Sequence, residues 1–246
     1  KDAIFNADGN PQLIASNRVL GQTIPFTGDY GISKNPESFA KDSYRAYFAD
    51  KQRGSVIRLS KDGLTPISDY GMSDYFKDSL GSTSATKLIG TYDDRKGEYN
   101  LTIPALSATA SFKESVNGWS SFKSFIPEQG INVSNNYYTF KKGIPYKHHV
   151  EVDQAGNSVD RNTFYGTYKP SVISVLLNDA PDVIKSYKTL NYEGSQSNVN
   201  IETTNVNTGY YNLENKDGWS NTLIETDKQK GSVSEFIEKE GKWFNY

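Results

Sequence analysis

The sequence contains no cysteine, and this absence removes several classes of chemistry. Without thiols there is no disulfide framework, no thiolate nucleophile and no cysteine-ligated zinc or iron–sulfur site. Stability must therefore come from packing and from strand pairing. Histidine is scarce as well, with two residues in 246, and methionine occurs once.

Long hydrophobic runs and an excess of charge of one sign are also lacking. The longest apolar runs are short, such as residues 171–177, whereas a membrane helix needs about 20 residues. The formal net charge is −2, so no basic field is available to hold nucleic acid. We therefore expect no membrane segment and no sequence-specific nucleic-acid partner. Because the chain opens at Lys1 and stops at Tyr246 without a leader or a tail, we expect a fragment of a longer polypeptide.

Aromatic residues are abundant instead, with 17 tyrosines, 12 phenylalanines and 3 tryptophans. Such residues favour pleated strands and subunit contacts. Tyrosine buries its ring and keeps a hydroxyl for a partner, which suits sheet edges and interfaces alike.

A hairpin pattern occurs three times, in residues 44–60, 88–103 and 137–150. Each copy has a strand of alternating character, a charged turn that contains a glycine, and a return strand. The turn glycines are Gly54, Gly97 and Gly143.

The spacing of the three turns is compatible with more than one β architecture. From Asp50 to Asp93 the distance is 43 residues, and from Asp93 to Lys141 it is 48 residues. A period in the forties is typical of four-stranded propeller blades, although consecutive hairpins of an open sheet or a sandwich fit as well. We predict a mainly β protein of consecutive antiparallel hairpins, arranged as propeller-like blades or a β-sandwich, with two or three short helices.

Further strands are predicted outside the three hairpins. Residues 64–67 follow a tight turn and extend the first hairpin, and residues 105–126 contain two strands joined at Asn117–Gly118. Residues 172–177 are the most apolar strand and are predicted to be central. The polar residues 196–207 predict one or two solvated strands.

Three short helices have sequence signals. The first starts with Ser73 as N-cap and ends at Gly81. The second follows Asp179 as cap and runs through Ile184 to Tyr187. In the third, Ser232 and Glu235 form a capping box, and the helix ends at Gly241.

These elements suggest three regions. Residues 1–43, rich in turn formers, are expected to be an extended lead-in. Residues 44–195 are expected to form an antiparallel β domain with blade-like hairpins. Residues 196–246 are expected to form a C-terminal β segment with a short capped helix.

Few residues are arranged as a reactive centre. The adjacent His148 and His149 are expected to point to opposite faces of a strand, so they cannot bind one metal together. His149 shares its face with Glu151 and Asp153, a possible metal site that is also typical of a solvent-facing strand end. We assign no metal site and no cofactor.

Two groups of acidic and amide residues also resemble reactive or metal-binding sites. Asp93 and Asp94 stand in a charged hairpin tip, where solvation explains them better than catalysis. Asn6, Asp8 and Asn10 resemble a calcium loop, but the glycine and the closing glutamate are misplaced. We assign no catalytic residue and predict that the chain is not an enzyme.

Several longer strings resemble structural proteins of tailed bacteriophages, in particular β-rich tail and neck components of marine and crAss-like phages, including nozzle or muzzle proteins. The resemblance covers residues 26–246, and the strings include FTGDYGISKNPESFA, YRAYFADKQRGSVIRLSKDGLTPIS, TYDDRKGEYNLT, FKESVNGWSSFKSFIPEQG, YYTFKKG and KSYKTLNYEGSQS. It implies a structural part of the virion tail or neck, assembled in the host bacterial cytoplasm as a ring of identical copies that binds other virion proteins. It implies no catalytic residues.

Two other functions compete with this interpretation. A receptor- or glycan-binding module of a tail fibre would stack sugars on exposed aromatics such as Trp119 and Trp219. A tail-borne glycanase would need two facing carboxylates, with Glu114, Glu128 and Asp160 as candidates. Aromatics exposed in a groove would favour the first alternative, and aromatics buried at contacts would favour assembly.

Overall fold

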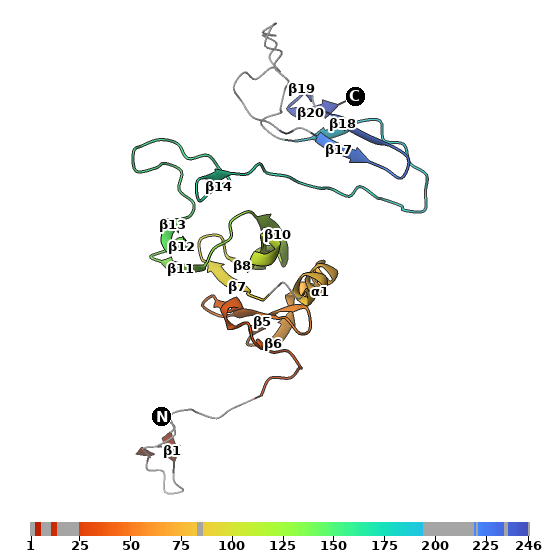
Figure 1. The fold of residues 1–246 in the computed structure, drawn as a ribbon. Helices are drawn as coiled ribbons and strands as arrows, with labels where there is room; N and C mark the ends of the chain where they lie inside the picture. The colour runs from red at the N-terminus through yellow and green to blue at the C-terminus, as the bar shows by residue number, and fades with distance from the viewer. Residues whose placement is uncertain are drawn as a thin grey trace. The chain divides into compact units, whose positions relative to one another are not determined.

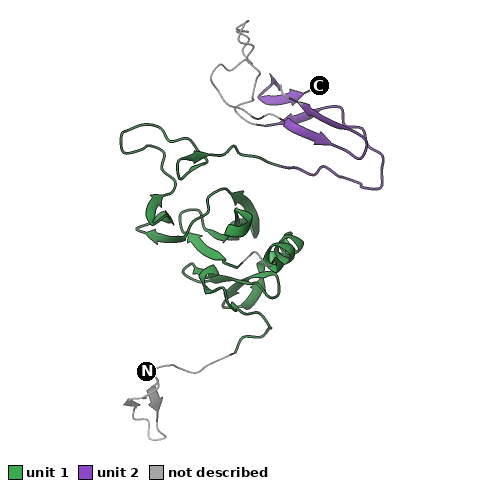
Figure 2. Cartoon of the chain, viewed as in Figure 1, with its two compact units in different colours: residues 1–173 green, residues 174–246 purple. Residues whose placement is uncertain are grey.

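The computed structural model describes residues 3–5, 11–13, 25–82, 86–193, 219, 221–233 and 236–245. The chain forms two compact units, residues 1–173 and 174–246 (Figures 1 and 2). Strands dominate both units, and every strand pair is antiparallel among the described residues, which confirms the mainly β class. The predicted region boundaries at residues 43 and 195 stay predictions.

The first unit begins with a short hairpin of β1 (Ala3–Phe5) and β2 (Pro11–Leu13). A four-stranded sheet, here called the first layer, follows in chain order. Its strands are β3 (Ala40–Lys41), β4 (Ala46–Asp50), β5 (Ser55–Ser60) and β6 (Gly63–Pro66). Short 3-10 helices, η1 (Pro36–Ser38) and η2 (Ile67–Asp69), flank it.

The second layer is another four-stranded sheet in chain order. Its strands are β7 (Ile89–Asp93), β8 (Glu98–Ile103), β9 (Ala108–Lys113) and β10 (Gly118–Lys123), with η3 (Pro104–Leu106) and η4 (Glu114–Val116) between them. Asn117 adopts a left-handed backbone with φ 50° at the predicted turn into β10. The predicted strand pair of residues 105–126 is therefore confirmed.

The third layer has three strands, β11 (Gln129–Val133), β12 (Asn136–Lys141) and β13 (Ile144–Lys147). All three predicted hairpins are thus present, and their turn glycines have φ values of 62°, 63° and 72°, the left-handed region that favours glycine. The small hairpin of β14 (Thr163–Phe164) and β15 (Thr167–Tyr168) follows.

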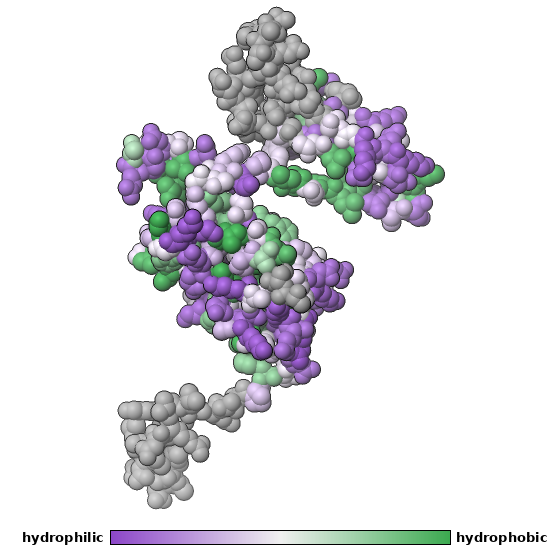
Figure 3. Space-filling view, in the orientation of Figure 1, coloured by the Kyte–Doolittle hydropathy of each residue, from purple (hydrophilic) through white to green (hydrophobic). Residues whose placement is uncertain are grey.

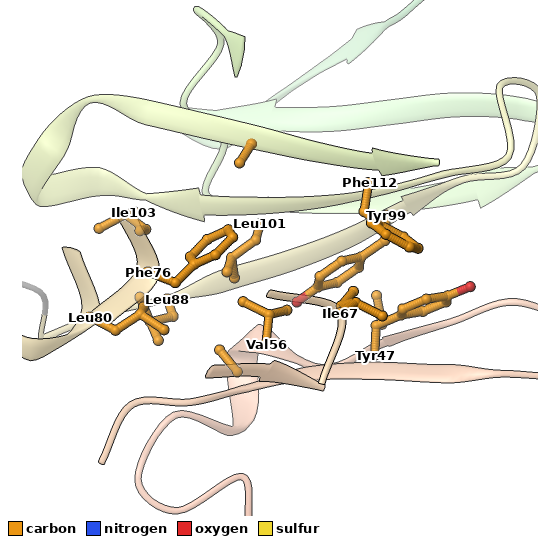
Figure 4. Close-up of a cluster of buried hydrophobic side chains, with 13 residues drawn as sticks. Tyr47, Val56, Ile67, Phe76, Leu80, Leu88, Tyr99, Leu101, Ile103 and Phe112 are labelled. Carbon is orange, nitrogen blue, oxygen red and sulfur yellow. The ribbon is translucent and has the colours of Figure 1, made fainter. Parts of the chain in front are cut away.

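The hydrophobic core lies between the first and second layers. Tyr47 of β4 stacks on Tyr99 of β8, with ring centroids 5.0 Å apart. The buried side chains come from both sheets and from the helix (Figure 4): Ala40, Tyr47, Ala49, Val56, Ile67, Phe76, Leu80, Leu88, Tyr99, Leu101, Ile103, Ala110 and Phe112. These two sheets pack face to face as in a sandwich, and no barrel is closed by the strands that the structure describes.

The predicted helix at residues 73–81 is present as α1 (Ser73–Gly81), which buries Phe76 and Leu80 in the core. Met72 rather than Ser73 is its N-cap, and no side chain caps it. Asp74 lies in the first turn, where a negative charge favours the helix dipole.

The other two helix predictions are wrong. Residues 179–187 form bends and extended chain, because a short segment with β-branched Val183 and Ile184 and no packing surface has too little to stabilise a helix. Residues 230–233 belong to β18 and residues 237–239 to β19, so no helix spans 232–241. Glu240 and Gly241, with φ 54° and 78°, instead make a hairpin turn.

The prediction of a central strand at residues 172–177 is also wrong. This segment has no strand assignment, and Val172 and Leu176 are 80% and 89% exposed. Among the described strands, β8 is buried along its whole length of six residues.

The second unit contains two small sheets. β16 (Leu190–Tyr192), β20 (Lys242–Asn245) and β19 (Ile237–Lys239) form one, and β17 (Asn221–Glu225) with β18 (Lys230–Val233) forms the other. Phe236 and Trp243 are buried against Tyr192. The predicted strand region 196–207 and the loop at Asn6, Asp8 and Asn10 lie outside the described residues.

Candidate functional site

Strands β7 to β9 of the second layer are mostly buried on both faces, and the two faces differ in chemistry. The first face contributes Tyr99, Leu101 and Ile103 to the hydrophobic core. The opposite face is polar and packs on the third layer, where a Cβ on Gly130 would lie 2.7 Å from Thr91 Cγ2. We call this second interface the polar interlayer; its buried residues are Thr91, Asp93, Glu98, Asn100, Thr102, Thr109, Ser111, Tyr137, Thr139 and His148.

The polar interlayer is held by short hydrogen bonds between hydroxyl groups. Thr91 Oγ1 and the Tyr137 hydroxyl lie 2.7 Å apart, as do Thr102 Oγ1 and Thr109 Oγ1. Thr109 Oγ1 also donates to the carbonyl of Phe125 at 2.6 Å. Buried polar groups are tolerated when they are paired, and the bond between Thr91 and Tyr137 joins the second layer to the third.

The two histidines lie just after β13, at the end of the polar interlayer. His149 has a left-handed backbone with φ 59°, which ends the strand alternation, and the imidazole centroids are 6.2 Å apart. The prediction of two histidines on opposite faces of a strand is therefore wrong.

His148 is enclosed by aromatic rings. Its ring centroid is 4.9 Å from that of Phe125 and 4.7 Å from that of Tyr137, and Nε2 lies 2.7 Å from Thr139 Oγ1. Burial, together with the neighbouring His149, lowers the pKa of His148 to about 4. The residue is therefore neutral at physiological pH.

His149 pairs with Asp93 and not with the predicted carboxylates. Its Nε2 lies 2.6 Å from Asp93 Oδ2, and Asp93 is 1% exposed. The other oxygen of Asp93 accepts from the backbone amides of Arg95 and Lys96 in the β7–β8 turn. This aspartate therefore closes the hairpin tip and fastens it to the third layer.

The predicted metal group is not assembled. Asp153 accepts from the backbone amides of Ala155 and Asn157 at 2.9 and 2.8 Å, so it caps its own turn, and these bonds lower its pKa. Glu151 is exposed. Among the described residues no group of three or more histidine, aspartate or glutamate side chains is placed to hold a metal ion.

The carboxylates considered for a glycanase have structural partners or lie in open loops. Glu114 pairs with Arg58 at 2.9 Å and accepts from the Tyr47 hydroxyl at 2.8 Å. Glu128 accepts from the amides of Lys142 and Gly143, which lowers its pKa, and so holds the β12–β13 turn. Asp160 is exposed in a loop, and Asp94 is exposed in its turn. Partial loss of solvent around Asp94, together with the nearby Asp93, raises the pKa of Asp94.

The tryptophans proposed as sugar platforms are placed differently. Trp119 donates its Nε1 hydrogen to the carbonyl of Ile67 at 2.9 Å, and its ring packs 4.5 Å from Phe76. Trp119 is therefore partly buried and packs against the hydrophobic core. Trp219, in the second unit, is 45% exposed.

The sequence did not indicate a group of three side chains that meet in the polar interlayer, Glu98, Asn100 and Lys123. Lys123 at the end of β10 contacts the carboxylate of Glu98 and donates to Asn100 Oδ1 at 3.3 Å. The alternation of Glu98, Asn100 and Thr102 along β8 was a signal, but it is equally typical of a strand that faces water on one side.

Hydrophobic side chains are exposed along one extended segment of the second unit. We call residues 175–187 the apolar arm; its exposed side chains are Val175, Leu176, Leu177, Val183, Ile184 and Tyr187. The arm folds back at residues 178–185, where Lys185 Nζ donates to Asn178 Oδ1 at 2.9 Å and the Tyr187 hydroxyl donates to the Leu177 carbonyl at 2.7 Å. Figure 3 shows hydrophobic surface along this part of the chain.

Comparison with protein families gives two matches. A model of the Crassvirus muzzle protein matches residues 1–143, and a model of the Crassvirus muzzle protein C-terminal domain matches residues 159–246. A search of curated proteins finds no match. The structure also has no helix in its described part that is long and apolar enough to cross a membrane.

Proposed function

Because the chain belongs to the Crassvirus muzzle protein family and is thus a structural protein of a bacteriophage virion, we propose that it works by assembly. It associates with copies of itself in a ring at the tail or neck and binds neighbouring virion proteins. Assembly takes place in the host bacterial cytoplasm, where a chain without cysteine loses nothing in reducing conditions. This role is mechanical and needs no catalytic residue.

The observation that carries this proposal is the apolar arm. Its six side chains are between 55% and 94% exposed, with Ile184 the most exposed. Together they present on the order of 700 Å² of surface, close to the roughly 800 Å² that one partner contributes to a standard interface. Monomeric proteins rarely leave so much apolar surface in contact with water.

The backbone of the arm supports the same conclusion. Within residues 175–187 no strand pairing is present, and the described backbone bonds include only a turn contact, from the Val183 amide to the Ala180 carbonyl at 3.1 Å. Extended segments with β-branched residues add readily to an open sheet edge. A neighbouring copy offers apolar surface at β11, where Ile131 and Val133 are about half exposed.

The competing functions have less support. Trp119 is packed against Phe76 and Phe112, so it offers no face to a sugar. Glu114 and Glu128 hold an ion pair and a turn. We propose therefore that neither glycan binding at Trp119 nor hydrolysis is a function of this chain.

The mass of the recombinant chain in solution tests the proposal. We expect light scattering to show oligomers that form with increasing concentration, and the double variant Leu176→Asp/Ile184→Asp to shift them to monomer. Tyr44→Asp is the matched control, since Tyr44 is 86% exposed and lies outside the arm. A chain that stays monomeric throughout, or oligomers that survive the double change, would contradict the proposal.

Virions supply the second readout. Electron cryomicroscopy of intact particles is expected to place the chain in the tail or neck, with the arm covered by a neighbouring subunit. Absence of the chain from the particle would overturn the structural role.

A further inference from the structure

Lys123, Glu98 and Asn100 form a reactive combination inside the polar interlayer. The ammonium of Lys123 contacts the carboxylate of Glu98, and its Nζ lies 3.3 Å from Asn100 Oδ1. Asn100 is fully buried, and Glu98 is 8% exposed. An amine from β10 thus reaches across β9 to a carboxamide and a carboxylate on β8, in a largely buried setting.

The carboxamide of Asn100 is polarised from one side. Its Oδ1 accepts from Ser111 Oγ at 2.6 Å as well as from Lys123. Its Nδ2 is buried and makes no hydrogen bond of normal geometry, although it lies near the Tyr137 hydroxyl. Donors aimed at a carbonyl oxygen stabilise the negative charge that develops there during attack on the carbon.

We propose that Lys123 and Asn100 form an intramolecular isopeptide bond, with Glu98 as the proton carrier. Glu98 takes a proton from the Lys123 ammonium, and the neutral amine attacks Cγ of Asn100. The Ser111 hydroxyl stabilises the oxyanion on Oδ1. Protonated Glu98 then gives its proton to Nδ2, and the bond between Cγ and Nδ2 breaks. The second proton of the attacking nitrogen passes to the departing ammonia, which leaves as ammonium.

The balance of this reaction is complete without any further reactant. One amide bond replaces another, no atom is oxidised or reduced, and Glu98 ends as it began. Proximity favours the reaction, because the folded sheet already holds the Lys123 amine against the Asn100 carboxamide. The product ties β8 to β10 across β9 and closes a loop of 23 residues.

The chain contains a second contact between a lysine and an asparagine, and among the described residues no carboxylate pairs with this lysine. Lys185 Nζ lies 2.9 Å from Asn178 Oδ1, closer than in the buried pair, but Asn178 is exposed and Lys185 is only partly buried. Lys185 forms no ion pair with a carboxylate among the described residues. Contact between lysine and asparagine is therefore present at both places, whereas burial and the carboxylate are present only at Lys123.

Intact mass under denaturing conditions tests the proposal directly on the unmodified sequence. The folded chain, incubated at neutral pH, is expected to weigh about 17 Da less than its sequence, the mass of one ammonia. Tandem mass spectrometry after trypsin is expected to show one branched peptide that joins Asn100 to Lys123. A full sequence mass after prolonged incubation overturns the proposal.

Variants separate this bond from other losses of ammonia. Lys123→Arg keeps the positive charge beside Glu98 but has no attacking amine, so it is expected to restore the full mass, as is Glu98→Gln. Lys185→Arg is expected to retain the loss. A succinimide at Asn117–Gly118 would also remove ammonia, and a loss that persists in Lys123→Arg and vanishes in Asn117→Gln would assign it there and refute the cross-link.

Discussion

Gly90 in β7 provides a direct test of how the first unit is layered. A Cβ built at this position would lie 1.8 Å from the carbonyl oxygen of Ser38 and 2.4 Å from its carbonyl carbon. The contact is with backbone, so no side-chain rotation can relieve it. Gly90→Ala therefore forces η1 away from the second layer.

The cost of this substitution follows from what holds Ser38 in place. Its carbonyl accepts from the Tyr99 hydroxyl at 2.8 Å, and its Oγ accepts from the Ala49 amide at 3.0 Å. Overpacking costs about 1–3 kcal/mol, and loss of a buried hydrogen bond adds about 1 kcal/mol. We expect Gly90→Ala to lower the free energy of unfolding by about 3 kcal/mol.

The assay is urea denaturation of the chain in which Trp219 and Trp243 are replaced by phenylalanine. The fluorescence of Trp119 then reports the unfolding of the first unit. Gly81→Ala is the control, because nothing lies within 4 Å of its added Cβ and alanine favours the helix. An unfolding free energy for Gly90→Ala within about 0.5 kcal/mol of the parent would refute the face-to-face placement of η1 on β7.

Two further predictions concern single side chains. Because the pKa of His148 is about 4 in the folded state, below the ordinary value of 6.5, the unfolded state binds more protons between these values and stability falls as the pH drops. Between pH 7 and pH 5 we expect a loss of about 2 kcal/mol by urea denaturation that is absent in His148→Gln, and an equal loss in that variant would contradict the assignment. Trp119→Phe removes the hydrogen bond to the Ile67 carbonyl and is expected to cost about 1 kcal/mol in urea denaturation followed by circular dichroism, while any change in glycan binding would argue against its structural role.

Local signals predicted the hairpins well because turns are specified by neighbouring residues. Gly54, Gly97 and Gly143 stand where a left-handed backbone is required, and Asn117 adopts the same conformation before β10. The helix at residues 73–81 was predicted correctly for a related reason: its apolar residues Phe76 and Leu80 repeat at helical spacing and find a core to pack against.

Long-range packing was not readable in the same way. β8 is buried on both faces, yet its sequence alternates as if one face met water, since Glu98, Asn100 and Thr102 face a polar interlayer. The apolar residues 172–177 predicted a buried strand but are exposed. Hydrophobicity indicates a tendency to be buried, and it does not say which surface would cover the residues. The pairing of His149 with Asp93, 56 residues away, had no local signal.

The layers of the first unit follow one another along the chain, so the sheets can fold in the order in which they are synthesised. Strands β3 to β6 are complete before β7 begins, and β7 to β10 are complete before β11 begins. Each sheet can therefore form from the stretch of polypeptide just released by the ribosome, and then serve as the template on which the next sheet condenses. Pairing between neighbouring strands keeps loop closure short, which favours rapid folding and limits the time that sheet edges are open to aggregation. Growth by successive layers therefore keeps few strand edges unpaired at any one time.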